Sequence, residues 1–219
     1  MRKVFFALIF ILSFHFLSAQ QFRIGLTASP EFNFPRILAS NVSSGGVSVG
    51  LNYGLLVDFT IGEVERYAFS TGITHRMANV SIENIKLMDG SIEYTASQKL
   101  KLQYVEIPLT MRLRTNEIGY ITYYGQMGFI PGILISSRYD QKADISDPAY
   151  NFKNEKNKET VGLNLSLHVG GGIEYSLGGA TAIMAGLYYN NGFTKIYKTS
   201  FLDDKVSLRN IGLRLGLLF

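Results

Sequence analysis

The chain of 219 residues contains no cysteine. This absence excludes disulfide bonds, zinc sites built on thiolates, cysteine nucleophiles and lipid attachment to a cysteine. A long apolar run is also missing after the first 20 residues, whereas a transmembrane helix needs about 20 such residues. No motif indicates a metal ion or another cofactor. The sequence therefore excludes disulfide scaffolds and helical membrane domains.

The chain also lacks a large excess of basic or acidic residues. The chain has 21 basic and 17 acidic residues, and removal of Arg2 and Lys3 with a signal peptide leaves 19 basic residues, a net charge of about +2. A charge this small and dispersed gives no basic patch, so we expect no binding of nucleic acid. The remaining residues, 21–219, suffice for one domain.

Residues 1–20 have the three parts of a secretory signal peptide. Arg2 and Lys3 form the basic start, residues 4–17 are apolar, and Ala19 or Gln20 precedes the expected cleavage point. The alternative is an N-terminal membrane anchor, but the apolar part is short for a span of about 20 residues. We therefore expect an exported protein.

Strict alternation of apolar and polar residues is the main feature of the exported part. In residues 161–177 every odd position is apolar or glycine, and every even position is polar or glycine. A period of two places each set on one face of a strand. Strands cross a bilayer in about 10 residues only when a closed barrel pairs all their backbone groups. The pattern predicts a transmembrane β-barrel.

Similar alternation predicts eight strands in an antiparallel, up-and-down order. A change of phase near Gln103–Tyr104 predicts a β-bulge, with Leu100 and Leu102 outward before it. Short connections alternate with long ones, as in outer-membrane barrels with short periplasmic turns, so both termini are expected on the periplasmic side. The predicted strands are 22–29, 47–61, 66–77, 98–114, 118–135, 161–177, 180–190 and 205–219. The predicted long loops are 30–46, 78–97, 136–159 and 191–204.

Alternation alone does not distinguish the inside of a barrel from its outside. A soluble lipocalin-like barrel has the apolar face inside, and it remains an alternative. The last strand favours the membrane barrel, because its alternating apolar residues end on an aromatic one, as in the signal read by the outer-membrane assembly machinery. The candidate assembly signal comprises Ile211, Leu213, Leu215, Leu217 and Phe219.

The segment LQYVEIPLTMRLR at 102–114 resembles a strand of the PorT-like outer-membrane β-barrel family of Bacteroidetes-type bacteria. The similar part contains Tyr104, Val105, Glu106, Ile107, Pro108 and Leu109. The glycines at 125, 128 and 132 and the terminal GLRLGLLF are also similar to that family. The resemblance implies an eight-stranded barrel in a Gram-negative outer membrane, with a named relative in a gliding and secretion apparatus.

The inner face of such a barrel receives most of the charged strand residues. Eight-stranded barrels are narrow and filled by side chains, so these charges are expected to pair as a closed polar plug. A gated ion or proton path is the alternative. The candidate interior charge network is Arg23, Asp58, Arg76, Glu106, Arg112, Arg114, His168, Glu174 and Arg214.

Exposed polar residues suggest binding surfaces more than chemistry. His75 lies on the expected lipid face without a serine in phase, and no hydrolase motif stands in the context that it requires, so we predict no enzyme.

The loop 136–159 mixes lysines, acids and aromatics. It is expected either to dock lipopolysaccharide phosphates or a protein partner, or to be only a solvated loop. The function expected is a structural or interaction component of the outer membrane, in contact with its lipid and lipopolysaccharide. The family resemblance implies an accessory of a secretion or envelope complex. A small passive channel and a lipid-modifying enzyme are the alternatives.

Overall fold

A computed structural model describes residues 22–38, 42–62, 66–89, 92–145, 147–198 and 205–219. The predicted signal peptide lies outside these residues. The strands are β1 (Phe22–Leu38), β2 (Ser43–Ser44), β3 (Ser48–Thr60), β4 (Tyr67–Asp89), β5 (Ile92–Glu106), β6 (Leu109–Arg114), β7 (Ile121–Ala143), β8 (Phe152–Lys156), β9 (Leu163–Gly178), β10 (Thr181–Lys195) and β11 (Lys205–Leu218). The 3-10 helix η2 (Pro148–Tyr150) lies between β7 and β8, and no helix of the described residues is long and apolar enough to span a membrane.

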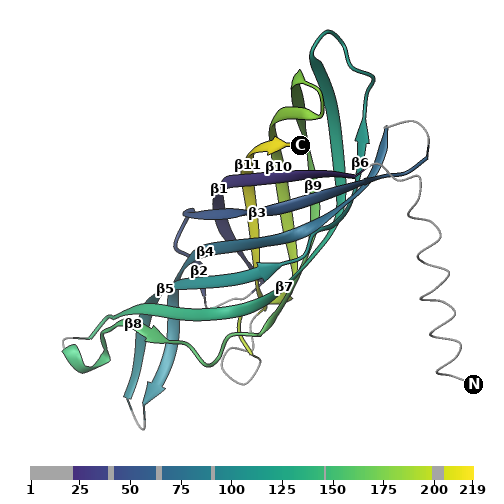
Figure 1. Cartoon of the computed structure of the whole chain (residues 1–219). Helices are drawn as coiled ribbons and strands as arrows, with labels where there is room; N and C mark the ends of the chain where they lie inside the picture. The colour runs from purple at the N-terminus through teal and green to yellow at the C-terminus, as the bar shows by residue number, and fades with distance from the viewer. Residues whose placement is uncertain (1–21, 39–41, 63–65, 90–91, 146, 199–204) are drawn as a thin grey trace, which may run out of the picture.

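The strands close into a ring of eight antiparallel strands (Figure 1). Each long strand pairs with its neighbour in the chain, and β1 pairs with β11 to close the ring. β5 and β6 form one ring strand, interrupted at Ile107–Pro108 because proline has no N–H to give to the ladder. The predicted all-β, eight-stranded fold is therefore confirmed, with β2 and β8 as short additions.

The barrel has a turn end and an extended end. The turn end contains the short connections around 61–66, 115–120 and 179–180, together with the first described residue and Phe219. At the extended end several strands continue well beyond the predicted lengths. The predicted loop 78–97 consists mostly of the hairpin of β4 and β5, and part of 136–159 belongs to β7 and β8. The loop predictions were wrong there because the apolar residues move from the outer to the inner face along these strands, which interrupts the alternation in hydropathy.

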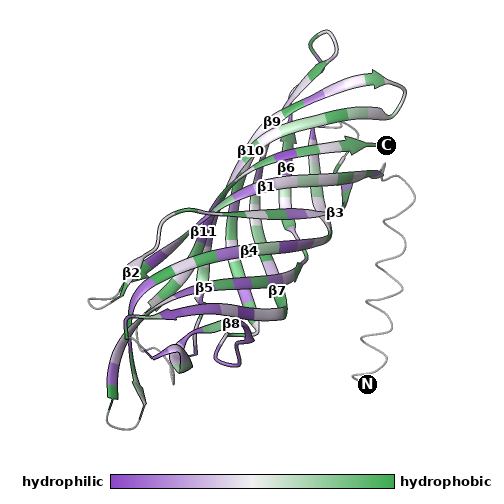
Figure 2. Cartoon of the chain, turned by 90° about the vertical axis from the view of Figure 1, so that its left-hand side faces the viewer, coloured by the Kyte–Doolittle hydropathy of each residue, from purple (hydrophilic) through white to green (hydrophobic). Residues whose placement is uncertain are grey.

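Near the turn end the outer face is apolar and the inner face is polar. On β3 the odd positions from Leu51 to Phe59 face outward, while Asp58 and Thr60 are buried inside. On β9 Leu165 is exposed and Ser166 is buried, as predicted. Figure 2 shows this alternation as bands of contrasting hydropathy along each strand. These outward residues form the apolar belt.

Towards the extended end the polarity of the two faces is reversed. Leu100 and Leu102 of β5 are buried in an apolar cluster with Val80, Ile82 and Tyr197, whereas the adjacent Lys99 and Lys101 are exposed. The prediction that Leu100 and Leu102 face outward was therefore wrong. This part is built like a soluble barrel, with its core inside, and hydrophilic segments gather at this end in Figure 2.

The backbone keeps its facing where the hydropathy changes. On β5 the even positions are inside from Gln98 to Glu106, so β5 contains no change of phase. The register does shift opposite Gln103 and Tyr104, where the partner β7 contains one extra residue, Ile135. The predicted irregularity exists, but the bulge is on β7. The apolar residues of β5 change from even to odd positions because the inner face meets the apolar cluster at Leu100 and Leu102 and the buried charges at Glu106.

Candidate functional site

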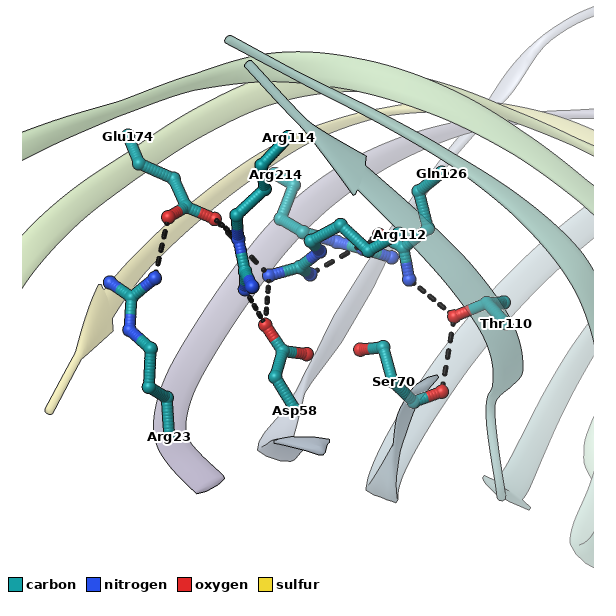
Figure 3. Close-up of polar contacts among 9 residues, drawn as sticks. All are labelled: Arg23, Asp58, Ser70, Thr110, Arg112, Arg114, Gln126, Glu174 and Arg214. Atoms are coloured by element: carbon teal, nitrogen blue, oxygen red, sulfur yellow. Dashed lines mark hydrogen bonds and ion pairs between the residues drawn. The ribbon is translucent and has the colours of Figure 1, made fainter. Parts of the chain in front are cut away.

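All nine residues of the predicted interior charge network lie on the inner face. Arg23 keeps a side-chain exposure of 21 %, and the other eight are buried. They divide into two groups along the barrel axis. The first lies near the turn end and is shown in Figure 3. The second surrounds Arg76, closer to the extended end.

The first group is an ion-pair cluster that crosses the lumen. Asp58 on β3 and Glu174 on β9 lie on strands half a ring apart. Arg112 Nη1 donates to Asp58 Oδ2 at 2.6 Å and to Glu174 Oε1 at 3.4 Å. Arg114 also binds both carboxylates, and Arg23 Nη1 donates to Glu174 Oε2 at 2.8 Å. Two acids thus hold three arginines in the middle of the barrel.

A glutamine extends this cluster to the next strands. Gln126 Oε1 accepts hydrogen bonds from Arg112 Nη2 at 3.2 Å and from Arg214 Nη1 at 2.8 Å. Its amide nitrogen donates to Thr110 Oγ1. The guanidinium of Arg112 also lies 5.0 Å from the ring centre of Tyr124, within the range of a cation–π contact. Six ring strands are joined in this way, which rigidifies the barrel.

The second group is centred on Arg76. Its Nε donates to Glu31 Oε2 at 2.8 Å, and its Nη1 donates to Glu106 Oε1 at 3.4 Å. Its Nη2 donates to the side-chain oxygens of Asn33 and Asn210, at 3.0 and 2.7 Å. A buried arginine with four such bonds is well compensated, and removal of one partner would leave an unpaired charge.

Glu31 was not recognised from the sequence, because the first strand was predicted to end at residue 29. Pro30 instead lies on the outer face, and β1 continues to Leu38. The signal that could have located Glu31 is Phe32, which keeps the outward phase of Leu26. With Glu31 included, the inner face contains four acids and five arginines.

Tyr188 connects the two groups. Its hydroxyl donates to Glu31 Oε1 at 2.7 Å, and the guanidinium of Arg214 lies 4.9 Å from its ring centre. Adjacent residues of a strand point to opposite faces, so Tyr188 lies inside the barrel while Tyr189 faces outward. The glycines of the inner face accommodate the Tyr188 ring, because Tyr188 is paired with Gly170 on one side and Gly212 on the other.

Comparison with known protein families identifies the class of this barrel. A family described as outer membrane protein beta-barrel domain matches residues 18–158. The chain belongs to this outer-membrane β-barrel family. No curated protein sequence matches the chain.

Several solved outer-membrane proteins are similar in structure. Neisserial surface protein A is 14 % identical over 92 % of this chain and 98 % of its own, with a TM-score of 0.49. Ail, the attachment invasion locus protein of Yersinia pestis, is 13 % identical over 90 % and 98 %, with a TM-score of 0.39. OprG of Pseudomonas aeruginosa is 12 % identical over 90 % and 95 %, with a TM-score of 0.40.

In an outer-membrane barrel, the apolar belt faces lipid. The candidate assembly residues Ile211, Leu213, Leu215 and Phe219 are exposed on this face of β11, and Leu217 is half-buried there. Phe219 is held by two backbone hydrogen bonds with Ile24, at 2.8 and 3.1 Å.

The mouth of the barrel at the turn end is an open vestibule of about 790 Å³. Its lining is mixed: Phe22 and Phe219 lie beside the charged residues Arg23, Arg66, Arg114 and Glu174. Three of these residues belong to the first ion-pair group, so the vestibule ends where that group crosses the lumen.

Two histidines and one serine motif offer no catalytic arrangement. His75 on the lipid face shares a hydrogen bond of 2.9 Å with Tyr53, and His168 inside bonds Asn190 at 2.6 Å. Residues 46–50 read G-V-S-V-G, the spacing of a hydrolase nucleophile, but Ser48 begins strand β3, whereas that motif needs a strand-to-helix turn. Among the described residues no group of three acids, histidines or cysteines could hold a metal ion.

Proposed function

We propose that this protein is a non-enzymatic interaction component of the outer membrane, whose working surface is the extended end of the barrel. The main support is the filled lumen. The ion-pair groups of Arg112 and Arg76 cross the barrel at two levels, and the apolar cluster around Leu102 occupies the part beyond them. A barrel closed by side chains at three levels is suited to holding a rigid surface in place.

The same proposal orients the barrel. Outer-membrane barrels have short turns on the periplasmic side and longer segments on the outer side. We therefore propose that the turn end, with both termini, faces the periplasm and that the hairpins β4–β5 and β7–β8 extend outside the cell. These hairpins are paired strands, so a partner would meet a preformed surface.

The absence of cysteine allows a direct test of this orientation. Single-cysteine variants Asn116→Cys, at the turn end, and Lys142→Cys, at the extended end, are treated on intact cells with a membrane-impermeant maleimide. We expect labelling of the position at 142 only, and labelling of the position at 116 after permeabilisation. Labelling at 116 alone in intact cells would reverse the orientation.

The docking role is tested at the tip between β7 and β8. Gln141 and Phe152 are paired across this hairpin, so an Asn-Gly turn can replace residues 142–151 without breaking the pairing below it. We expect this variant to assemble normally and to lose partner capture after crosslinking in cells. Glu117→Gly, a change confined to the turn end, serves as the control. Equal capture by both variants would contradict docking through this tip.

The segment around Glu106 supports a narrower assignment within the family. We propose a PorT-like protein, accessory to a secretion or envelope complex, because the residues from Tyr104 to Pro108 resemble that group. In this barrel Glu106 binds Arg76, and Pro108 interrupts the ring strand. A deletion strain should then lose secreted proteins from the culture medium, and unchanged secretion would remove this assignment.

A passive channel is the second candidate, because the vestibule leads from the turn end to Arg23 and Glu174. Planar-bilayer recordings distinguish the two functions. The interaction component should give no stepwise conductance, whereas steady conductance would favour the channel.

A third candidate function, a lipid-modifying enzyme, predicts altered lipid A in the deletion strain. We expect unaltered lipid A, since His75 bonds a tyrosine hydroxyl and His168 bonds an asparagine amide, rather than a serine or threonine hydroxyl.

A further inference from the structure

A row of basic side chains crosses three neighbouring strands on the outer face, beyond the apolar belt and towards the extended end. Lys101 of β5 is paired with Arg138 of β7, and Arg138 is paired with Lys156 of β8. Residues directly opposite each other on antiparallel strands share one face, and their Cβ atoms are about 4.5–5.5 Å apart. All three side chains are exposed. We call Lys101, Arg138 and Lys156 the basic row.

The basic row is poorly compensated within the protein. Like charges directly opposite each other destabilise a sheet. Lys101 is paired with Asp140, with Nζ 2.6 Å from Oδ2. In the described part of the chain, neither Arg138 nor Lys156 has a carboxylate oxygen within 4.0 Å, and Lys99, next to Asp140 on the same face, has none either. The surface thus retains several cations around one acid.

The position of the row along the barrel matches a headgroup layer. The last outward apolar residue on β7 is Ile135, which lies three residues, or about 10 Å of strand, before Arg138. Strands tilted by about 35–45° convert this distance to about 7–8 Å along the membrane normal. The headgroup layer of each leaflet is about 5–8 Å deep. The row therefore lies at the depth of lipid phosphates.

We propose that the basic row binds the phosphate groups of an outer-leaflet glycolipid, as found on lipid A. Arginine offers a fork of donors that fits phosphate oxygens, and lysine adds a point charge on either side. Three cations within about 10 Å can converge on one phosphate. This inference rests on the proposed orientation, which brings the extended end to the outer leaflet.

The test uses the purified, folded full-length barrel in neutral detergent, with bisphosphorylated lipid A as the probe. Binding is followed by native mass spectrometry, and dephosphorylated lipid A and inorganic phosphate are titrated in parallel. We expect binding of phosphorylated lipid A and at least about tenfold weaker binding of the other two, because the phosphate and the acyl chains are both needed.

The decisive variant combines Lys101→Gln, Arg138→Gln and Lys156→Gln. It should bind lipid A at least about tenfold more weakly while the barrel still folds without lipid, because the repulsion removed from the row offsets the lost contact between Lys101 and Asp140. The matched control combines Lys86→Gln, Lys142→Gln and Lys153→Gln, which removes three charges at least about 10 Å of strand away from the row. The control should bind as the wild type does.

Three outcomes would overturn the inference. The first is equal binding of phosphorylated and dephosphorylated lipid A, and the second is equal loss in the row variant and the control. The third is unaffected lipid A binding with loss of a captured protein, which would assign the row to an acidic protein partner. Failure of the proposed orientation is distinguishable, because the labelling at positions 116 and 142 reports it independently of lipid.

Discussion

Tyr188 of β10 lies directly opposite Gly212 of β11, and a Cβ atom on Gly212 would lie 2.2 Å from Cζ of the tyrosine ring. The ring cannot move aside freely, because its hydroxyl bonds Glu31 and its face contacts Arg214. Gly212 therefore leaves the space on the inner face that the Tyr188 ring occupies.

Gly212→Ala should destabilise the barrel by about 1–3 kcal/mol, the usual range for an overpacked interior. Urea unfolding in lipid vesicles measures the change. Gly125→Ala is the control, because no atom lies within 4 Å of a Cβ at that position. Equal stability of the two variants would contradict the packing of Tyr188 across Gly212.

Arg76→Met should destabilise the barrel by about 3–5 kcal/mol, since Glu31 and Glu106 lose their cation while still buried. Adding Glu31→Gln and Glu106→Gln to the Arg76→Met variant should recover a large part of this loss, because the unpaired charges are removed. The free energy of unfolding of the single and triple variants is compared. A triple variant no more stable than the single one would show that unpaired charges on Glu31 and Glu106 are not the source of the loss.

Leu102→Ala should cost about 2–5 kcal/mol, as expected for a cavity in a protein core. Leu109→Ala should cost less, because Leu109 is 42 % exposed on the apolar belt, where lipid fills the space. Both variants are measured by urea unfolding in the same vesicles. A larger effect at Leu109 would mean that Leu102 faces lipid, as its phase in the sequence suggested.

Asp140 lies beyond the apolar belt, and its hydrogen bonds to the Lys101 ammonium and to the Asn154 backbone N–H hold the pKa of its carboxyl below the usual range. A depressed pKa means that this contact stabilises the hairpin at neutral pH and is lost as the pH falls through the folded-state value. Protection of the Asn154 amide from hydrogen exchange should fall over that interval. Lys101→Gln should raise the pKa of Asp140, and an unchanged midpoint would contradict the role of Lys101.

The period of two in the sequence was sufficient for the number, order and facing of the eight strands near the turn end. Position in the alternation decides which side a residue takes, so Asp58, Arg112 and Glu174 could be assigned to the inner face without coordinates. The period does not show which side chains extend across the lumen to bond residues of the opposite wall. That Arg112 bonds both acids follows from the ring placing β3 opposite β9, which is a property of closure.

The surroundings of each face were decided only by the tertiary structure. Leu102 and Leu165 belong to similar alternating patterns. Leu102 is nevertheless buried in the core of the extended end, whereas Leu165 is exposed in the apolar belt. Glu31 became part of the Arg76 group because β1 continues past Pro30 to pair with β11. Alternation records which residues share a face of a strand. Whether that face meets lipid, water or the opposite wall depends on how far each paired strand extends beyond the belt.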